Sequence, residues 1–142
     1  KAGSGGSNVK MANTSTYVSD GSAVSQNTVQ SLTKTWVNFE GDASGSPIRD
    51  SFNVSSTDDD GVGDYGVNFS SSMSNNDYSM TGSACLSAFD NNDVGLIGPS
   101  RTNAAASLAT GSVQLDGQKS SNTDGAARDV NVACIAIHGD LA

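Results

Sequence analysis

The feature that most constrains the fold is a short stretch of strict alternation in the middle of the chain. Tyr65, Val67 and Phe69 are separated by single polar or small residues. Successive side chains of a β-strand point to opposite faces, so this spacing predicts a half-buried strand. Residues 48–56 alternate in the same way, and the Asp- and Gly-rich residues 57–63 between the two stretches are typical of a turn. The sequence therefore predicts a β-hairpin here.

The composition extends this prediction to the whole chain. There is a single Glu, with four Lys and three Arg, although helix surfaces normally use these long side chains. The 24 Ser, 13 Asn and 16 Gly favour turns and exposed strand faces. Further strand patterns cover residues 35–39, 78–86, 108–115 and 130–137. We expect an all-β, antiparallel β-sandwich, jelly-roll-like, with about six short strands.

The first residues differ from the rest. Residues 1–8 have the composition of a linker, and residues 9–33 carry scattered apolar side chains without a regular period. We expect residues 1–33 to form an extended N-terminal arm that mediates assembly. Residues 34–142 are expected to form the β-sandwich domain. Residues 130–137 are apolar on both faces, which indicates the centre of a sheet or a subunit interface.

The charge excludes two classes of partner. The net charge is −8, so no basic surface exists to meet the phosphates of a nucleic acid. The same charge disfavours anionic membranes, and no apolar run approaches the roughly 20 residues of a membrane span. We expect neither nucleic-acid binding nor membrane insertion.

One acidic segment is a candidate metal-binding site. Asp58, Asp60 and Asp64 lie around the glycine-containing turn, and clustered carboxylates can bind calcium. The alternating acids and the later Glu of an EF-hand are missing, so a solvated turn is the favoured interpretation and calcium the alternative. Residues 90–93 leave the same two alternatives. No other cofactor is expected.

The sequence also argues against an enzyme. His138 is the only histidine, and the Gly-x-Ser-x-Gly motif of a nucleophile elbow does not occur. We therefore expect no catalytic residue. Cys85 and Cys134 lack the spacing of a metal site and are expected to be small buried residues, with a disulfide as the alternative. The three arginines, Arg49, Arg101 and Arg128, are expected to form salt bridges either within one subunit or between subunits.

Several motifs together resemble a known module. They are Trp36-Val37-Asn38-Phe39-Glu40-Gly41, Ile48-Arg49-Asp50-Ser51-Phe52-Asn53-Val54-Ser55-Ser56, Asp60-Gly61-Val62-Gly63-Asp64-Tyr65-Gly66-Val67-Asn68-Phe69, Met73 with Asp77-Tyr78, and the final Val130–Asp140. This pattern resembles a β-rich module of tail fibre and virion surface proteins of tailed bacteriophages, especially marine phages and cyanophages. The resemblance covers residues 34–142, and the first 33 residues match nothing in it.

The resemblance implies a structural virion protein of the fibre type or associated with the tail, which attaches to the host surface. It implies a location on the virion surface, assembly in the host cytoplasm, and a homo-oligomer, expected to be a trimer. Other virion proteins and a host cell-surface glycan or protein would be its partners. The alternatives are a capsid decoration or cement protein that stabilises the phage head and a non-viral extracellular filament subunit. Loops 70–77, 88–103 and 117–127 are expected to form a binding surface at one end of the sandwich.

The motifs also predict structural roles. The main apolar cluster is expected to contain Trp36, Phe39, Phe52, Val54, Tyr65, Val67 and Phe69. If the indole of Trp36 is fully buried, Trp36→Ala is expected to lower the free energy of unfolding by roughly 3–5 kcal/mol. Gly61 and Gly63 are expected to supply positive φ in the hairpin turn. Asn38, Asn53 and Asn68 are expected to tie loops to the backbone through side-chain hydrogen bonds.

Overall fold

The computed structural model describes residues 11–12, 14–18, 21, 25–86, 94–100, 107–120 and 126–141. The chain divides into two units, Lys1–Leu32 and Thr33–Ala142, one residue away from the expected boundary. In the first unit, β1 (Thr16–Val18) pairs antiparallel with β2 (Ser25–Asn27). The Asn27 side chain accepts hydrogen bonds from the backbone of Val29 and Gln30, which fixes the turn after β2.

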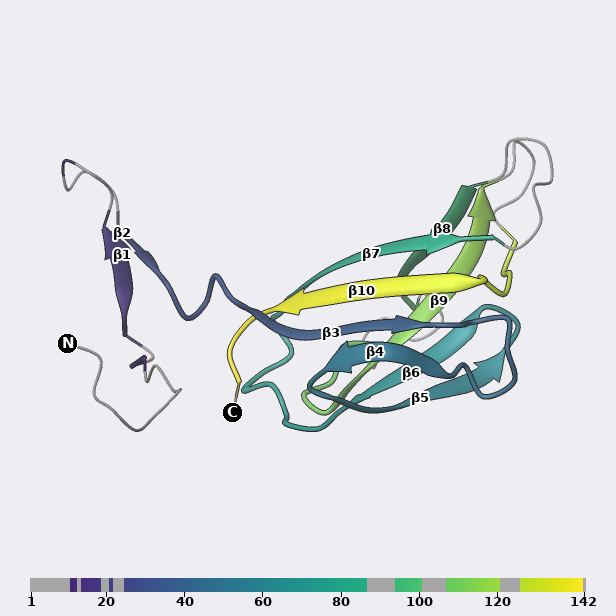
Figure 1. Ribbon diagram of the computed structural model, residues 1–142, viewed down its shortest axis with the longest axis horizontal. Helices are drawn as coiled ribbons and strands as arrows, with labels where there is room; N and C mark the ends of the chain where they lie inside the picture. Colours follow the sequence, from purple (N-terminus) through teal and green to yellow (C-terminus); the bar gives the residue numbers. More distant parts are fainter. Residues whose placement is uncertain are drawn as a thin grey trace. The chain divides into compact units, whose positions relative to one another are not determined.

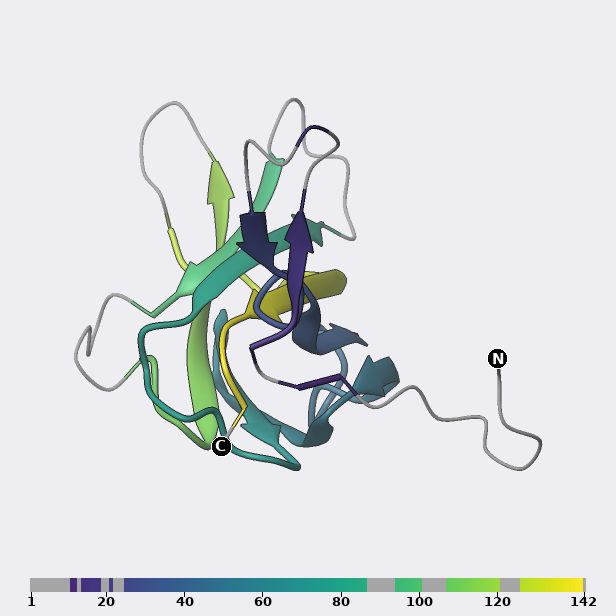
Figure 2. The same cartoon turned by 90° about the vertical axis from the view of Figure 1, so that its left-hand side faces the viewer.

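The second unit is built from two four-stranded antiparallel sheets. The first sheet has the order β4-β3-β10-β7, and the second has the order β5-β6-β9-β8. Figures 1 and 2 show the sheets from two directions, with the yellow β10 running between β3 and β7. The strands are β3 (Thr33–Phe39), β4 (Ile48–Phe52), β5 (Val54–Gly61), β6 (Asp64–Phe69), β7 (Ser79–Cys85), β8 (Val94–Pro99), β9 (Ser112–Ser120) and β10 (Val132–His138). The prediction of an all-β antiparallel sandwich is confirmed, whereas this strand order does not confirm a jelly-roll-like connectivity.

The core lies between the two sheets and follows the alternation of their strands. Every second residue of the central strands points inward and is at most 8% exposed, and the phenyl ring of Phe39 meets the ring of Tyr65 edge-on at 5.4 Å between centroids. The inward residues of the four central strands are Val37, Phe39, Tyr65, Val67, Phe69, Val113, Leu115, Ala133, Ile135 and Ile137. Because aromatic rings bury large apolar areas, Phe39 and Tyr65 dominate this core.

Two aromatic residues expected in the core lie elsewhere. Trp36 pairs in register with Phe52 on the outer face of the first sheet, opposite to the face of Val37 and Phe39. Phe52 is 52% exposed, and Trp36 is half-buried. The prediction that both belong to the main cluster is wrong. β3 carries large apolar side chains on both faces, so its alternation does not by itself decide which face is buried.

The first connection between the sheets is a corner without a loop. Asn53 has a positive φ of 59° and stands alone between β4 in the first sheet and β5 in the second. Its side chain accepts a hydrogen bond from the Ser71 backbone N–H and donates to the Ser71 carbonyl and to Thr35 Oγ1. The predicted backbone role of Asn53 is confirmed. Asn68 instead donates to the side chains of Ser56 and Asp58.

The hairpin between β5 and β6 is tighter than expected. Gly61 and Gly63 have φ values of 147° and 66°, which confirms their predicted positive φ. However, Asp58, Asp59 and Asp60 belong to β5 rather than to the turn. β5 is an edge strand with an open side toward solvent, so it can carry exposed charges while it pairs with β6.

The other edge of the sandwich is closed by a close approach of β7 and β8. A Cβ atom on Gly82 would lie 3.1 Å from the Ile97 carbonyl oxygen, and one on Gly95 would lie 3.0 Å from the Ala84 carbonyl. Glycine at both positions therefore lets the two edge backbones come together. The adjoining β9 extends to Ser120 because its last residues pair with β8, so its predicted range of 108–115 is wrong.

Candidate functional site

The outer face of the first sheet is hollowed between β7 and β10. The hollow has a volume of about 290 Å³ and is lined by Thr81, Gly82, Ser83, Cys134, Ile135 and Ala136. Thr81 pairs in register with Ala136, and Ser83 pairs with Cys134. All four of these outward side chains are small, so they leave the sheet surface low over these two strands.

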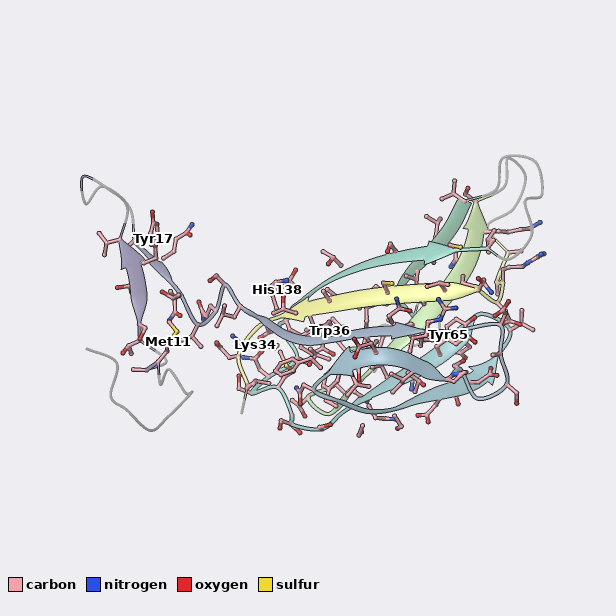
Figure 3. All side chains as sticks on the ribbon, in the orientation of Figure 1. Met11, Tyr17, Lys34, Trp36, Tyr65 and His138 are labelled. Carbon is pink, nitrogen blue, oxygen red and sulfur yellow. The ribbon has the colours of Figure 1, made fainter. Side chains whose placement is uncertain are left out.

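An aromatic ridge stands next to this hollow. In one cross-strand row the register places Phe52 on β4, Trp36 on β3, Ala136 on β10 and Thr81 on β7. Large side chains therefore occupy one half of the row, and small side chains occupy the other half. Side chains in such a row lie close enough to act as one surface. Figure 3 labels Trp36 on β3 and His138 at the end of the adjacent β10.

The two outer faces of the sandwich differ in charge. The outer face of the first sheet carries Asp50 on its edge strand β4, whereas the second sheet places Asp58, Asp64 and Asp116 on β5, β6 and β9. Burial raises the pKa of Asp64 above 3.8, and the neighbouring carboxylates of Asp60 and Asp116 raise it further. In a chain of net charge −8, the outer face of the first sheet is thus comparatively neutral.

The residues considered for calcium are partly engaged with other groups. Asp58 Oδ2 accepts a hydrogen bond of 2.6 Å from Asn68 Nδ2, while Asp60 and Asp64 lie on the two strands of the hairpin. Among the residues that the structure describes, no group of three or more carboxylate, thiol or imidazole side chains is arranged to hold a metal ion. Calcium at Asp58, Asp60 and Asp64 stays the untested alternative to the favoured solvated segment, and residues 90–93 lie outside the described residues.

The histidine and the cysteines have ordinary surroundings. His138 Nε2 lies 3.4 Å from Thr33 Oγ1 at the end of the first sheet. Cys85 and Cys134 are free thiols, the first exposed and the second half-buried. Their register with Val132 and Ser83 places both on the outer face of the first sheet. The interpretation of Cys85 as a buried residue is therefore wrong.

Among the described residues, Arg49 forms an ion pair with Glu40. Arg49 donates through Nε and Nη2 to Glu40 Oε1 at 2.9 and 2.7 Å. The side chains of Arg49 and Glu40 are 46% and 36% exposed, so water screens the pair and it contributes at most about 1 kcal/mol. The backbone N–H of Arg128 bonds to the Gly117 carbonyl. Arg101 lies outside the described residues.

The expected loops do not meet at one end. Residues 70–77 lie beside the start of β9, where the Met73 N–H donates to the Thr110 carbonyl. Residues 117–120 form the far end of the same nine-residue strand, roughly 30 Å away at about 3.4 Å per residue. The predicted common binding surface is wrong for residues 70–77 and 117–120 for this reason, and residues 121–125 lie outside the described residues. Most of residues 88–103 outside β8 is not described.

The sequence pattern placed Tyr65 in the apolar cluster but did not predict the backbone hydrogen bonds of the Tyr65 and Tyr78 hydroxyls. Burial raises the pKa of Tyr65 to about 12, and burial likewise raises the pKa of Tyr78 to about 12. The Tyr65 hydroxyl accepts from the Val130 N–H, and the Tyr78 hydroxyl lies 3.1 Å from the carbonyls of Ala109 and Ser112. Both hydroxyls thus bind backbone groups between the sheets. For Tyr65, a hydroxyl on an inward strand position is the sequence signal that points to such a role, whereas Tyr78 directly precedes β7.

Comparison with known proteins identifies no relative: no family model, no curated protein and no solved structure matches the chain. Within the described ranges, no helix is long and apolar enough to cross a membrane.

Proposed function

We propose that this chain is a structural component of the surface of a tailed-phage particle, of the fibre type or associated with the tail, that takes part in attachment to the host. Copies of the chain assemble with one another and with other virion proteins. The observation that carries the proposal is the neutral outer face of the first sheet, where an aromatic ridge and a hollow lie side by side. Such a face on an acidic domain fits contact with another macromolecule.

The motifs that carry the resemblance support a structural role. Within them, Phe39, Tyr65, Val67 and Phe69 fill the core, Asn53 turns the chain from one sheet to the other, and Gly63 shapes the hairpin. Each of these residues makes the scaffold rather than a reaction site. Motifs that build only the scaffold fit a structural module, in which the exposed surfaces and not the motif residues bind the partner.

A capsid decoration protein is the second candidate. Residues Lys1–Leu32 form a unit separate from the sandwich, and this unit contains a short hairpin of its own. A second unit gives a decoration protein a means to reach a neighbouring subunit. A separate unit is equally compatible with a fibre module joined to another segment, so it does not favour either role. We keep the fibre-type role because that role is inferred from the outer face of the sandwich and not from the first unit.

Labelling of intact particles distinguishes the two candidates. An antibody against the sandwich, visualised by electron microscopy, is expected to mark the tail or its fibres. Label over the whole head would assign the chain to capsid decoration and contradict the fibre-type role. Particles without label, from a lysate in which the chain is expressed, would contradict both candidates.

A further inference from the structure

We propose that the outer face of the first sheet binds the same face of a second copy of this chain, as a two-fold pair. This proposal deepens the proposed function, rests on it only for the biological setting, and replaces the trimer that the resemblance implies with a two-fold pair. The contact surface consists of the rows Phe52–Trp36–Ala136–Thr81 and Asp50–Asn38–Cys134–Ser83, and we call it the pairing face.

The shape of the pairing face is complementary to itself. The ridge of Phe52 and Trp36 lies on β4 and β3, and the hollow lies over β10 and β7. A two-fold axis that runs parallel to the strands above the boundary of β3 and β10 exchanges these halves. It places Trp36 of one copy over the partner's Ala136, and Phe52 over the partner's Thr81. A two-fold interface requires this kind of reciprocal match.

The sizes of the facing side chains suit the spacing of stacked sheets. Sheets pack roughly 10 Å apart when the side chains between them interdigitate. A large residue then needs a small one opposite, and the hollow of about 290 Å³ supplies that room next to the ridge. The outer face of the second sheet also exposes apolar side chains, Val94 and Leu96, on its edge strand β8. Its two central strands carry Asp64 and Asp116 on that face, so a pair formed there would bring carboxylates of both copies together.

Charge selects the same face. Two copies that each carry a net charge of −8 repel one another, so a stable contact must avoid the carboxylates. Asp58, Asp64 and Asp116 rule out the outer face of the second sheet on this ground. On the pairing face, Asp50 is exposed on the edge strand β4, where the two-fold axis brings it opposite the partner's Ser83 at the rim.

Sedimentation of the full chain tests the pair, with the single tryptophan as an internal reporter. We expect a species of twice the chain mass that forms as concentration rises, together with a shift of Trp36 emission to shorter wavelength. Higher ionic strength should strengthen the pair because salt screens the repulsion of like charges. A chain that stays monomeric, a trimer, or a pair that salt weakens would overturn the proposal.

Two matched variants locate the contact. Thr81 is exposed on the edge strand β7, so Thr81→Glu adds a charge to the hollow without disturbing the core. It should raise the dissociation constant at least tenfold. Gln114→Glu adds the same charge to the outer face of the second sheet and should leave the constant unchanged. A pair unaffected by Thr81→Glu would overturn the proposal.

A third variant tests the ridge side of the contact, and a ligand titration tests whether the face binds a glycan instead of a second copy. Phe52→Ser shortens the exposed ridge and should also raise the dissociation constant, with the melting temperature of each variant as the check on folding. If the chain is monomeric and a neutral oligosaccharide shifts its Trp36 emission, the face binds a glycan and the pairing is overturned. Failure of the pairing leaves the particle-labelling result untouched, so the two proposals fail separately.

Discussion

The hydroxyl of Tyr65 accepts a hydrogen bond of 3.0 Å from the backbone N–H of Val130, and this bond joins the second sheet to the segment that leads into the first. Asp129 next to it accepts from the Gly63 N–H at 2.8 Å. Three glycines, Gly41, Gly63 and Gly117, lie so close to Tyr65 or to residues 128–130 that a side chain on any of them would collide. One end of the sandwich is thus held together around a single phenol.

Tyr65→Phe should destabilise the sandwich by about 1–3 kcal/mol, because it leaves the buried N–H of Val130 without its partner. Denaturant unfolding at neutral pH measures the change. Tyr17→Phe is the matched control, since Tyr17 in β1 is 61% exposed and its loss of a hydroxyl should change little. Equal effects of the two variants would contradict the assigned role of Tyr65.

Gly117→Ala should also destabilise the sandwich, by roughly 1–3 kcal/mol. The added Cβ would lie 2.9 Å from the Arg128 carbonyl oxygen and 2.9 Å from Tyr65 Cε2, and the backbone oxygen cannot move away freely. Gly98→Ala in the neighbouring β8 is the control, because no described atom lies within 4 Å of a Cβ there. Thermal unfolding of both variants decides the matter, and a more harmful Gly98→Ala would refute the packing at Gly117.

Phe39→Ala should cost about 3–5 kcal/mol, the usual range for removing a fully buried ring. Trp36→Ala should cost clearly less, because the indole is half-buried on the outer face and part of its apolar area stays in contact with water. Unfolding free energies of the two variants test the assignment of the faces of β3. A larger loss for Trp36→Ala would mean that the burial of the two faces is reversed.

Asp64→Asn should stabilise the sandwich at neutral pH by less than about 1 kcal/mol, the scale of surface charge interactions. The pKa of Asp64 is raised by burial and by Asp60 and Asp116, so the folded state disfavours its ionised form. The penalty is absent below the unfolded pKa of about 3.8 and grows as the pH rises through the raised pKa. The gain in melting temperature should therefore appear at pH 7 and vanish in acid. The same substitution at exposed Asp77 is the control, and an equal gain there would contradict the explanation.

Removal of residues 1–32 should leave the unfolding of the sandwich unchanged, because Thr33–Ala142 forms its own unit with its own core. The same truncation should weaken the incorporation of the chain into particles. A melting curve and a particle-binding assay measure the two effects independently. If the truncated chain fails to fold, the sandwich depends on the first unit, and the division near residue 33 is wrong.

The sequence predicted those parts of the fold in which one face of a strand is clearly apolar. Tyr65, Val67 and Phe69 alternate with small or polar residues, so their inward face was predictable. Trp36 was not, because both faces of β3 carry large apolar side chains. The three aspartates of β5 have the composition of a turn, but hydrogen bonding to β6 and an open edge keep them in a strand.

The candidate site was beyond prediction from sequence for a different reason. The hollow combines residues 81–83 with residues 134–136, and only the order of strands in the first sheet brings β7 and β10 together. The ridge requires in addition that β4 pair with β3 in a register that sets Phe52 beside Trp36. Local patterns indicate which residues face outward, whereas neighbours across a sheet depend on the topology of the whole domain.

The central place of β10 has a consequence for the way the chain is made. All four strands of the second sheet precede residue 121, so that sheet can assemble before β10 is available. The first sheet cannot, because β3 and β7 are joined only through β10. Until Val132–His138 leaves the ribosome, the inner, apolar face of the second sheet stays uncovered. Partly folded chains with such exposed apolar surface are prone to aggregate. Synthesis that stalls before β10 would leave β7 without its partner in the first sheet and β3 with an open edge.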